Sequence, residues 1–381
     1  MQDDARVRRH AEAVVWGAMS APSPELRVRA TRITADVADP LLDRGLGARL
    51  GDPSPSVRAI AAGALTRQLP LAGDVLRAVL DGNDAAAKVI AIDAIGSIED
   101  GKARLATLAA DGDVRVRARV ATAIAQWKPE GARALLDKLV RDEDAGVRGQ
   151  ALAGLAQYGD QSALGEIAGA LEDPSLGVRL AALGALVRLG RDAVGNQLLV
   201  LGSGPQATKD RYVALRAAVQ LSRVGHKRDA LPALRAAADD RDPAVRAAAM
   251  NAAGELGRDG YALAAAHLRD PDVDVRLAAA RAAIATGHHD VALPALVGAL
   301  ETPRRLDAAD ELARIDDARG LAVLAAAAHA PDARERRVAV ALLGPLPDGR
   351  AALVAALGDA DADVRLDAAG ALLRRFLRYD R

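Results

Sequence analysis

The chain has 381 residues, of which 51% are hydrophobic but only 2% are aromatic. Lys plus Arg and Asp plus Glu both total 51, so the formal net charge is zero. The sequence therefore lacks the basic excess typical of proteins that bind a nucleic-acid backbone or an anionic membrane. There is no cysteine, which excludes disulfides and zinc sites with thiolate ligands.

The apolar residues are mainly Ala, Leu and Val, and they predict an all-α protein. Ala and Leu are strong helix formers, and Ala lets helices pack closely. No apolar run approaches the roughly 18 residues that a membrane-spanning helix needs. The start, Met1-Gln2-Asp3-Asp4, lacks the pattern of a signal peptide, which slightly favours a cytoplasmic location. A periplasmic or secreted location stays open if a signal peptide has been removed.

One phrase recurs along the chain: an aspartate followed six residues later by an arginine. It occurs at residues 52–58, 111–117, 142–148, 173–179, 240–246, 270–276 and 359–365. Weaker copies centre on Arg29, Lys88, Ala214, Arg305 and Arg337. The twelve anchors lie 28 to 35 residues apart. This regular spacing indicates a tandem array of repeats.

Each repeat is predicted to contain two helices. The second helix is expected to begin at the aspartate of the phrase, because Asp can accept a backbone N–H at an N-cap. From Val147 onward, apolar residues recur at intervals of three and four, which is the stripe of one helix face. Glycine is expected to end many of these helices. These glycines are Gly159, Gly190, Gly225, Gly257 and Gly287.

The phrase D-P-x-x-x-V-R-x-x-A, closing with L-G, resembles HEAT repeats, and most of all the short HEAT-like repeats of the phycobilisome-lyase type. The resemblance covers the chain from about Asp3 to Arg378. It implies a right-handed α-solenoid of about twelve two-helix HEAT-like repeats. We therefore expect one solenoid over residues 1–381, with capping repeats at residues 1–39 and 348–381. The abundance of Ala, Arg, Asp and Gly favours a bacterial source.

The resemblance also implies a structural role for the arginines of the phrase. In HEAT-like solenoids such arginines form an internal ladder, each pairing with Asp side chains and helix-end groups of its own or a neighbouring repeat. The fork of donors on Arg suits such bridging. The expected ladder residues are Arg58, Arg117, Arg148, Arg179, Arg246, Arg276 and Arg365.

The second helices of such a solenoid line its concave side, which is its default binding surface. Counting from the Val of each phrase, positions 3, 6 and 10 are expected to face this groove. The 33 residues from Ser203 to Arg235 hold seven basic and two acidic residues. We hypothesise that a basic stripe there contacts an acidic segment of a partner; a solvated charged face is the alternative. The candidate partner-binding residues are Arg188, Lys209, Arg216, Arg223, Arg119, Gln150, Gln157, Asn251 and Arg281.

We predict no catalytic residue, no metal site and no cofactor. The six histidines include no His-Glu dipeptide, which di-iron hydroxylases built on HEAT-like repeats carry in pairs. His288 and His289 are expected in an exposed turn, with no third metal ligand nearby. Trp127 and Tyr158 hold the same position in consecutive repeats, and we expect both rings in the core rather than facing DNA.

The sequence thus favours a non-enzymatic scaffold or adaptor that binds a protein on its concave face, alone or within a larger assembly. One alternative is a nucleic-acid-binding repeat protein that uses the basic stripe of the sixth to eighth repeats. Another is a lyase-like or chaperone-like HEAT protein acting on a partner that carries a cofactor. Salt dependence separates the first two, because phosphate binding weakens steeply with ionic strength.

Overall fold

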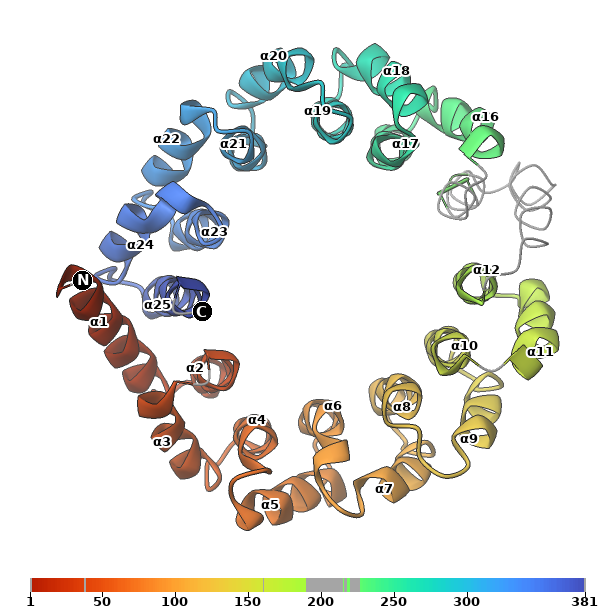
Figure 1. Ribbon diagram of the computed structural model, residues 1–381, viewed down its shortest axis with the longest axis vertical. Helices are drawn as coiled ribbons and strands as arrows, with labels where there is room; N and C mark the ends of the chain where they lie inside the picture. The colour runs from red at the N-terminus through yellow and green to blue at the C-terminus, as the bar shows by residue number, and fades with distance from the viewer. Residues whose placement is uncertain are drawn as a thin grey trace. The chain divides into compact units, whose positions relative to one another are not determined.

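The computed structural model describes residues 2–37, 39–159, 161–189, 215, 218, 219 and 227–379. These residues form α-helices and short 3-10 turns and contain no strand, which confirms the all-α class. Figure 1 shows the helices following one another in pairs. Two compact units are present. Unit 1 comprises Met1–Asp160 with Ala328–Arg381, and unit 2 comprises Gln161–Ala327.

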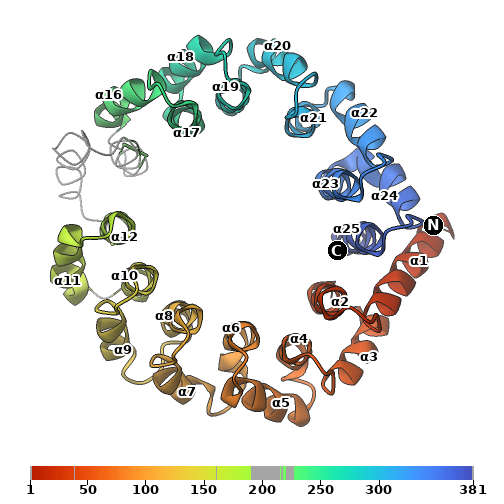
Figure 2. The ribbon, with the colours of Figure 1, turned by 180° about the vertical axis from the view of Figure 1, so that it is seen from behind.

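In unit 1 the first helix of each repeat lies in an A layer and the second in a B layer. The B layer is on the concave side of the unit in both views (Figures 1 and 2). The A helices are α1 (Gln2–Ala18), α3 (Pro40–Arg49), α5 (Pro70–Asp81), α7 (Gly101–Leu108), α9 (Ala132–Leu139) and α24 (Arg350–Ala356). The B helices are α2 (Pro24–Val37), α4 (Pro55–Leu65), α6 (Ala85–Asp93), α8 (Val114–Trp127), α10 (Ala145–Tyr158), α23 (Ala333–Leu343) and α25 (Ala362–Tyr379).

Unit 2 has the same alternation of helices. Its A helices are α11 (Leu164–Gly169), α16 (Lys227–Ala238), α18 (Arg258–His267), α20 (His289–Ala299) and α22 (Ala318–Ala327). Its B helices are α12 (Leu176–Arg188), α17 (Pro243–Ala253), α19 (Val273–Ala285) and α21 (Arg305–Arg314). None of the described helices is long and apolar enough to span a membrane.

The B helices begin two residues later than the sequence indicated. Asp142 accepts the backbone N–H of Asp144 at 2.9 Å, which closes a turn before the helix. Asp144 is the N-cap, and its carboxylate accepts the N–H of Val147 at 3.0 Å. The phrase aspartate therefore shapes the turn, and a second polar residue caps the helix. Asp142 can therefore also accept a side chain from a neighbouring repeat.

The predicted apolar stripe and glycine stops are found where residues are described. In α10, Val147, Ala151 and Leu155 are fully buried. Gly159 ends this helix with a φ of 81°, a left-handed conformation that favours glycine. Gly257 and Gly287 also have positive φ, whereas Gly190 and Gly225 lie outside the described residues.

The first and last repeats of the chain are neighbours within unit 1. Helix α25 packs against both α1 and α2, as α4 packs against both α5 and α6. The predicted capping repeats, residues 1–39 and 348–381, therefore lie against each other. Gly370 lies at this contact, because a Cβ there would lie 2.9 Å from Cδ1 of Ile33. Figure 1 shows α25 beside α1 and α2.

Candidate functional site

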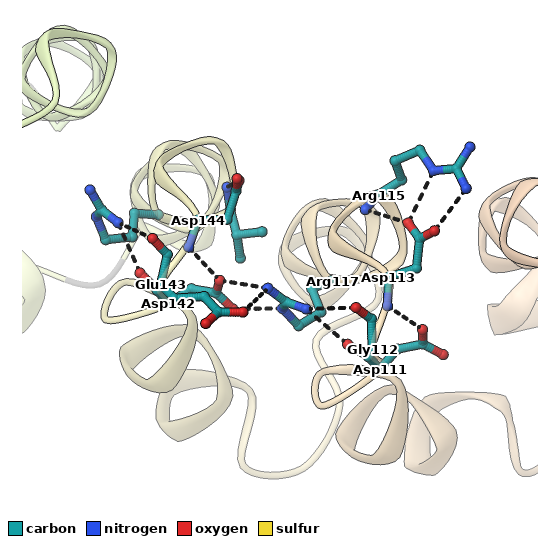
Figure 3. Close-up of polar contacts among 10 residues, drawn as sticks. Asp111, Gly112, Asp113, Arg115, Arg117, Asp142, Glu143 and Asp144 are labelled. Carbon is teal, nitrogen blue, oxygen red and sulfur yellow. Dashed lines mark hydrogen bonds and ion pairs between the residues drawn. The ribbon is translucent and has the colours of Figure 1, made fainter.

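A buried arginine joins the fourth and fifth repeats (Figure 3). Arg117 donates from Nη1 to the carbonyl oxygens of Asp111 and Gly112, in the turn before its own helix. Its Nε and Nη2 donate to the two carboxylate oxygens of Asp142 at 2.8 and 2.9 Å. These hydrogen bonds hold the pKa of Asp142 below its usual value, although burial acts in the opposite direction. One side chain thus fixes a turn and clamps the next repeat.

The seven predicted ladder arginines all make the first half of this contact. Each donates from Nη1 to the carbonyl oxygens six and five residues earlier. Arg246 also makes the second half of the contact, as Arg117 does. Its Nη2 and Nε donate to the two carboxylate oxygens of Asp270, in the next repeat, at 2.8 and 2.9 Å. In the third repeat Lys88 takes the arginine's place and donates to Asp111 at 2.7 Å.

Two anchors of the weaker copies are corrected by the structure. The sequence indicated Arg29 and Arg337, but the ladder positions are held by Arg27 and Arg336. Arg27 contacts the carbonyls of Ala21 and Pro22 and both oxygens of Asp52. Arg336 repeats this pattern with Asp359 of the last repeat. Arg29 and Arg337 lie on the same two B helices, but both pair with Asp367 instead.

Two of the predicted groove arginines are compensated by acids on the neighbouring B helix. Arg119 of α8 pairs with Asp93 at the end of α6. In unit 2, Arg281 of α19 pairs with Glu311 of α21 at 2.6 Å. Sequence reasoning missed these pairs because it examined one helix at a time. The acids lie 26 and 30 residues from their arginines, close to one repeat, and that spacing is the signal that could have found them.

The uncharged groove residues of unit 1 lie side by side on two packed B helices. Helices α8 and α10 pack directly against each other. Gln126 of α8 and Gln150 and Gln157 of α10 have exposed side chains, and we call these three residues the amide strip. Ala153, between the two glutamines of α10, adds only a methyl group. The strip is therefore a neutral surface of amide donors and acceptors.

The remaining predicted residues fall in unit 2 or outside the described residues. Arg188 is exposed at the end of α12, and Asn251 is exposed on α17. Lys209, Arg216 and Arg223 lie outside the described residues, so the basic stripe has no structural account. Within the described ranges, no group of three or more His, Asp or Glu side chains is arranged to hold a metal ion.

Trp127 and Tyr158 are half-buried rather than in the core, and each contacts an adjacent repeat. Trp127 lies on Gly96 of the preceding repeat, where a Cβ would overlap the indole ring. The ring of Tyr158 lies 5.2 Å from Nζ of Lys128, a distance suited to a cation–π contact. His288 corrects the expectation of an exposed turn: it is half-buried, and its ring stacks on Tyr261 with centroids 3.5 Å apart. Their separation of 27 residues is again close to one repeat.

Residues 101–187, 132–205 and 198–268 match the family described as HEAT repeats. The chain is an α-solenoid of two-helix repeats, and residues 101–268 of it resemble HEAT repeats. No curated protein matches it. The same two-helix unit continues on both sides of the matched residues, from α1 to α6 and from α20 to α25.

Three solved structures illustrate the similarity of this chain to other proteins. The complex of CpcE and CpcF of phycocyanin lyase from Nostoc sp. PCC7120 is 20% identical, with 65% of this chain and 94% of that chain covered and a TM-score of 0.37. YibA from Escherichia coli is 18% identical, with 70% and 98% covered and a TM-score of 0.42. Kap121p bound to Pho4p is 13% identical, with 95% and 48% covered and a TM-score of 0.42. None of these similarities assigns an activity to this chain.

Proposed function

We propose that this HEAT-repeat chain is a non-enzymatic scaffold that binds an extended segment of a partner protein along the amide strip of unit 1. The observation that carries the proposal is the chemistry of this face. Gln126, Gln150 and Gln157 are exposed on adjacent B helices, and the nearby guanidinium of Arg119 is paired with Asp93. The face therefore offers hydrogen-bonding groups without an excess of either charge.

Amide side chains suit the backbone of an extended peptide. Each glutamine donates from its NH₂ group and accepts at its carbonyl oxygen, so it can satisfy both polar groups of a peptide unit. An extended segment has no internal backbone hydrogen bonds and needs such partners when it leaves water. The small side chain of Ala153, between Gln150 and Gln157, lets a peptide backbone approach α10 closely.

The test is capture of partners from the native organism by wild type and two variants. The first variant carries Gln126→Ala, Gln150→Ala and Gln157→Ala, which remove only the amide groups. The matched control carries Lys102→Ala, Glu130→Ala and Lys138→Ala, three exposed polar residues on the A side of the same repeats. We expect a protein that is retained by wild type and by the control and lost from the amide variant.

The same captures distinguish protein from nucleic acid. Binding through neutral amides should persist as salt is raised, whereas phosphate binding should fall steeply and disappear after nuclease treatment. A captured protein should also slow amide hydrogen exchange in α8 and α10. Equal retention by the amide variant and wild type would refute the proposed site, and nuclease-sensitive capture would refute the proposed class of partner.

A further inference from the structure

The last and first repeats meet in the same register as internal neighbours. Gly63 lies six residues after Val57 of the second repeat, and a Cβ on it would lie 3.0 Å from Cβ of Ala94 in the third. Gly370 likewise lies six residues after Val364 of the last repeat. Both glycines thus occupy one position of the B helix and admit a side chain of the next repeat.

The side chains that approach the two glycines are also equivalent. Ala94 lies six residues after Lys88, the ladder residue of its repeat, and Ile33 lies six residues after Arg27. The first repeat therefore stacks on the last as the third stacks on the second. A contact in repeat register is the kind of contact that α-solenoid repeats use for their nearest neighbours.

Ion pairs cross this junction in both layers. In the B layer, Arg29 of α2 forks between Asp363 and Asp367 of α25. In the A layer, Nη2 of Arg350, at the start of α24, pairs with Asp4 of α1 at 2.7 Å. These five residues are charged complements placed on opposite sides of the junction. The end faces of the chain thus recognise each other by charge as well as by shape.

The junction has no carboxylate at the acceptor position of the ladder. That position lies six residues before the ladder arginine, and in the first repeat it holds Ala21. The ion pairs that cross the junction are more exposed than an internal ladder pair. Arg29 and Asp363 have side-chain exposures of 28% and 42%, whereas those of Arg27 and Asp52 are 12% and 1%. Salt screens exposed pairs much more than buried ones.

We propose that the face of α25 that carries Asp363, Asp367 and Gly370 is a docking surface for the first repeat of the same chain, and that this contact opens reversibly while the repeats stay folded. Raised ionic strength weakens the exposed pairs of Arg29 and Arg350 but spares the buried ladder within the stack. The contact is thereby a salt-sensitive latch between the two termini.

The absence of cysteine allows a direct test with introduced dye pairs. Ala13→Cys with Ala351→Cys places dyes on α1 and α24, which are consecutive A helices across the junction. Ala103→Cys with Ala134→Cys places the control pair on α7 and α9, consecutive A helices inside unit 1. All four positions are exposed. In low salt we expect efficient energy transfer between the dyes of both pairs. In high salt we expect the transfer to fall in the junction pair but not in the control pair. The helical circular dichroism signal should stay unchanged.

Charge reversal at the latch provides the second test. Arg29→Glu should abolish junction transfer in low salt, because it places a third carboxylate beside Asp363 and Asp367. Arg32→Glu, an exposed change of the same charge on the same helix, should leave it intact. The proposal is overturned if junction transfer is absent from wild type in low salt, or if it survives both high salt and Arg29→Glu.

Discussion

Arg117 holds both carboxylate oxygens of Asp142, at 2.8 and 2.9 Å, and connects two repeats that are adjacent in the stack. Its exposed fraction is only 7%, so the charge is compensated inside the protein rather than by water. Buried ion pairs stabilise only when their remaining donors are satisfied. Here the carbonyls of Asp111 and Gly112 take the remaining Nη1 donor.

The first prediction concerns the loss of this arginine. Arg117→Ala leaves the carboxylate of Asp142 and two turn carbonyls without their donor, and it should lower the free energy of unfolding by about 2–4 kcal/mol. Arg115→Ala is the matched control, because Arg115 is exposed and pairs with Asp113 of its own turn. The control should change stability by less than about 0.5 kcal/mol. Urea unfolding followed by circular dichroism measures both, and equal losses would contradict the prediction.

The second prediction is a dependence of stability on pH. The hydrogen bonds from Arg117 lower the pKa of Asp142 in the folded protein below the unfolded value of about 3.9. A group with a depressed folded pKa contributes its full stability above the unfolded pKa and loses it as pH falls through the folded pKa. We therefore expect wild type to lose stability below about pH 4. The Arg117→Ala variant should lose less over the same range, and parallel curves would count against this role of Asp142.

The sequence was sufficient for the features that depend on local spacing. The turn carbonyls, the buried valine and the ladder arginine of each clear phrase lie within seven residues of one another. The pattern failed where two arginines compete for one position, as with Arg27 and Arg29. Only contact with Asp52 of the next repeat shows which one is the ladder residue. The compensation of Arg119 by Asp93 has the same origin, because it depends on how neighbouring helices are registered.

Contact between the termini is beyond any repeat pattern. Small rotations between successive repeats accumulate along a solenoid, and the pattern of one repeat does not specify their sum. Gly370 and Ile33 illustrate this point, because nothing in the sequence around either residue indicates that the two are in contact. The pairing of Arg29 with Asp363 likewise spans 334 residues.

The third prediction tests the corrected register of the eleventh repeat. Arg336 donates to Ala330, Pro331 and Asp359, whereas Arg337 has one described pair, with Asp367. Arg336→Ala should therefore destabilise the protein by about 2–4 kcal/mol and Arg337→Ala by less than about 1 kcal/mol. The two variants remove the same side chain from adjacent positions of one helix, so the change in helix propensity is the same in both and does not affect their difference in stability. Urea unfolding in which Arg337→Ala is the more damaging change would restore the sequence-based register.

The fourth prediction concerns glycines at the first turn of the A helices. A Cβ on Gly101 would overlap the carbonyl oxygen of Ile95 and lie 2.8 Å from Cγ1 of Ile98. Gly260, Gly320 and Gly349 meet a carbonyl of the preceding B helix in the same way. The glycine therefore permits the short connection between the two helices. A larger residue there would have to displace backbone atoms, which cannot move aside as a flexible side chain can.

Gly101→Ala should lower the free energy of unfolding by about 1–3 kcal/mol, the usual cost of overpacking. Gly184→Ala is the matched control in the interior of α12, because no atom lies within 4 Å of its added Cβ. Alanine is the better helix former, so the control should raise stability by about 0.5–1 kcal/mol. Denaturation of the two variants beside wild type should thus give shifts of opposite sign. Shifts of the same sign would show that helix propensity or general crowding, rather than backbone contact at Gly101, governs these positions.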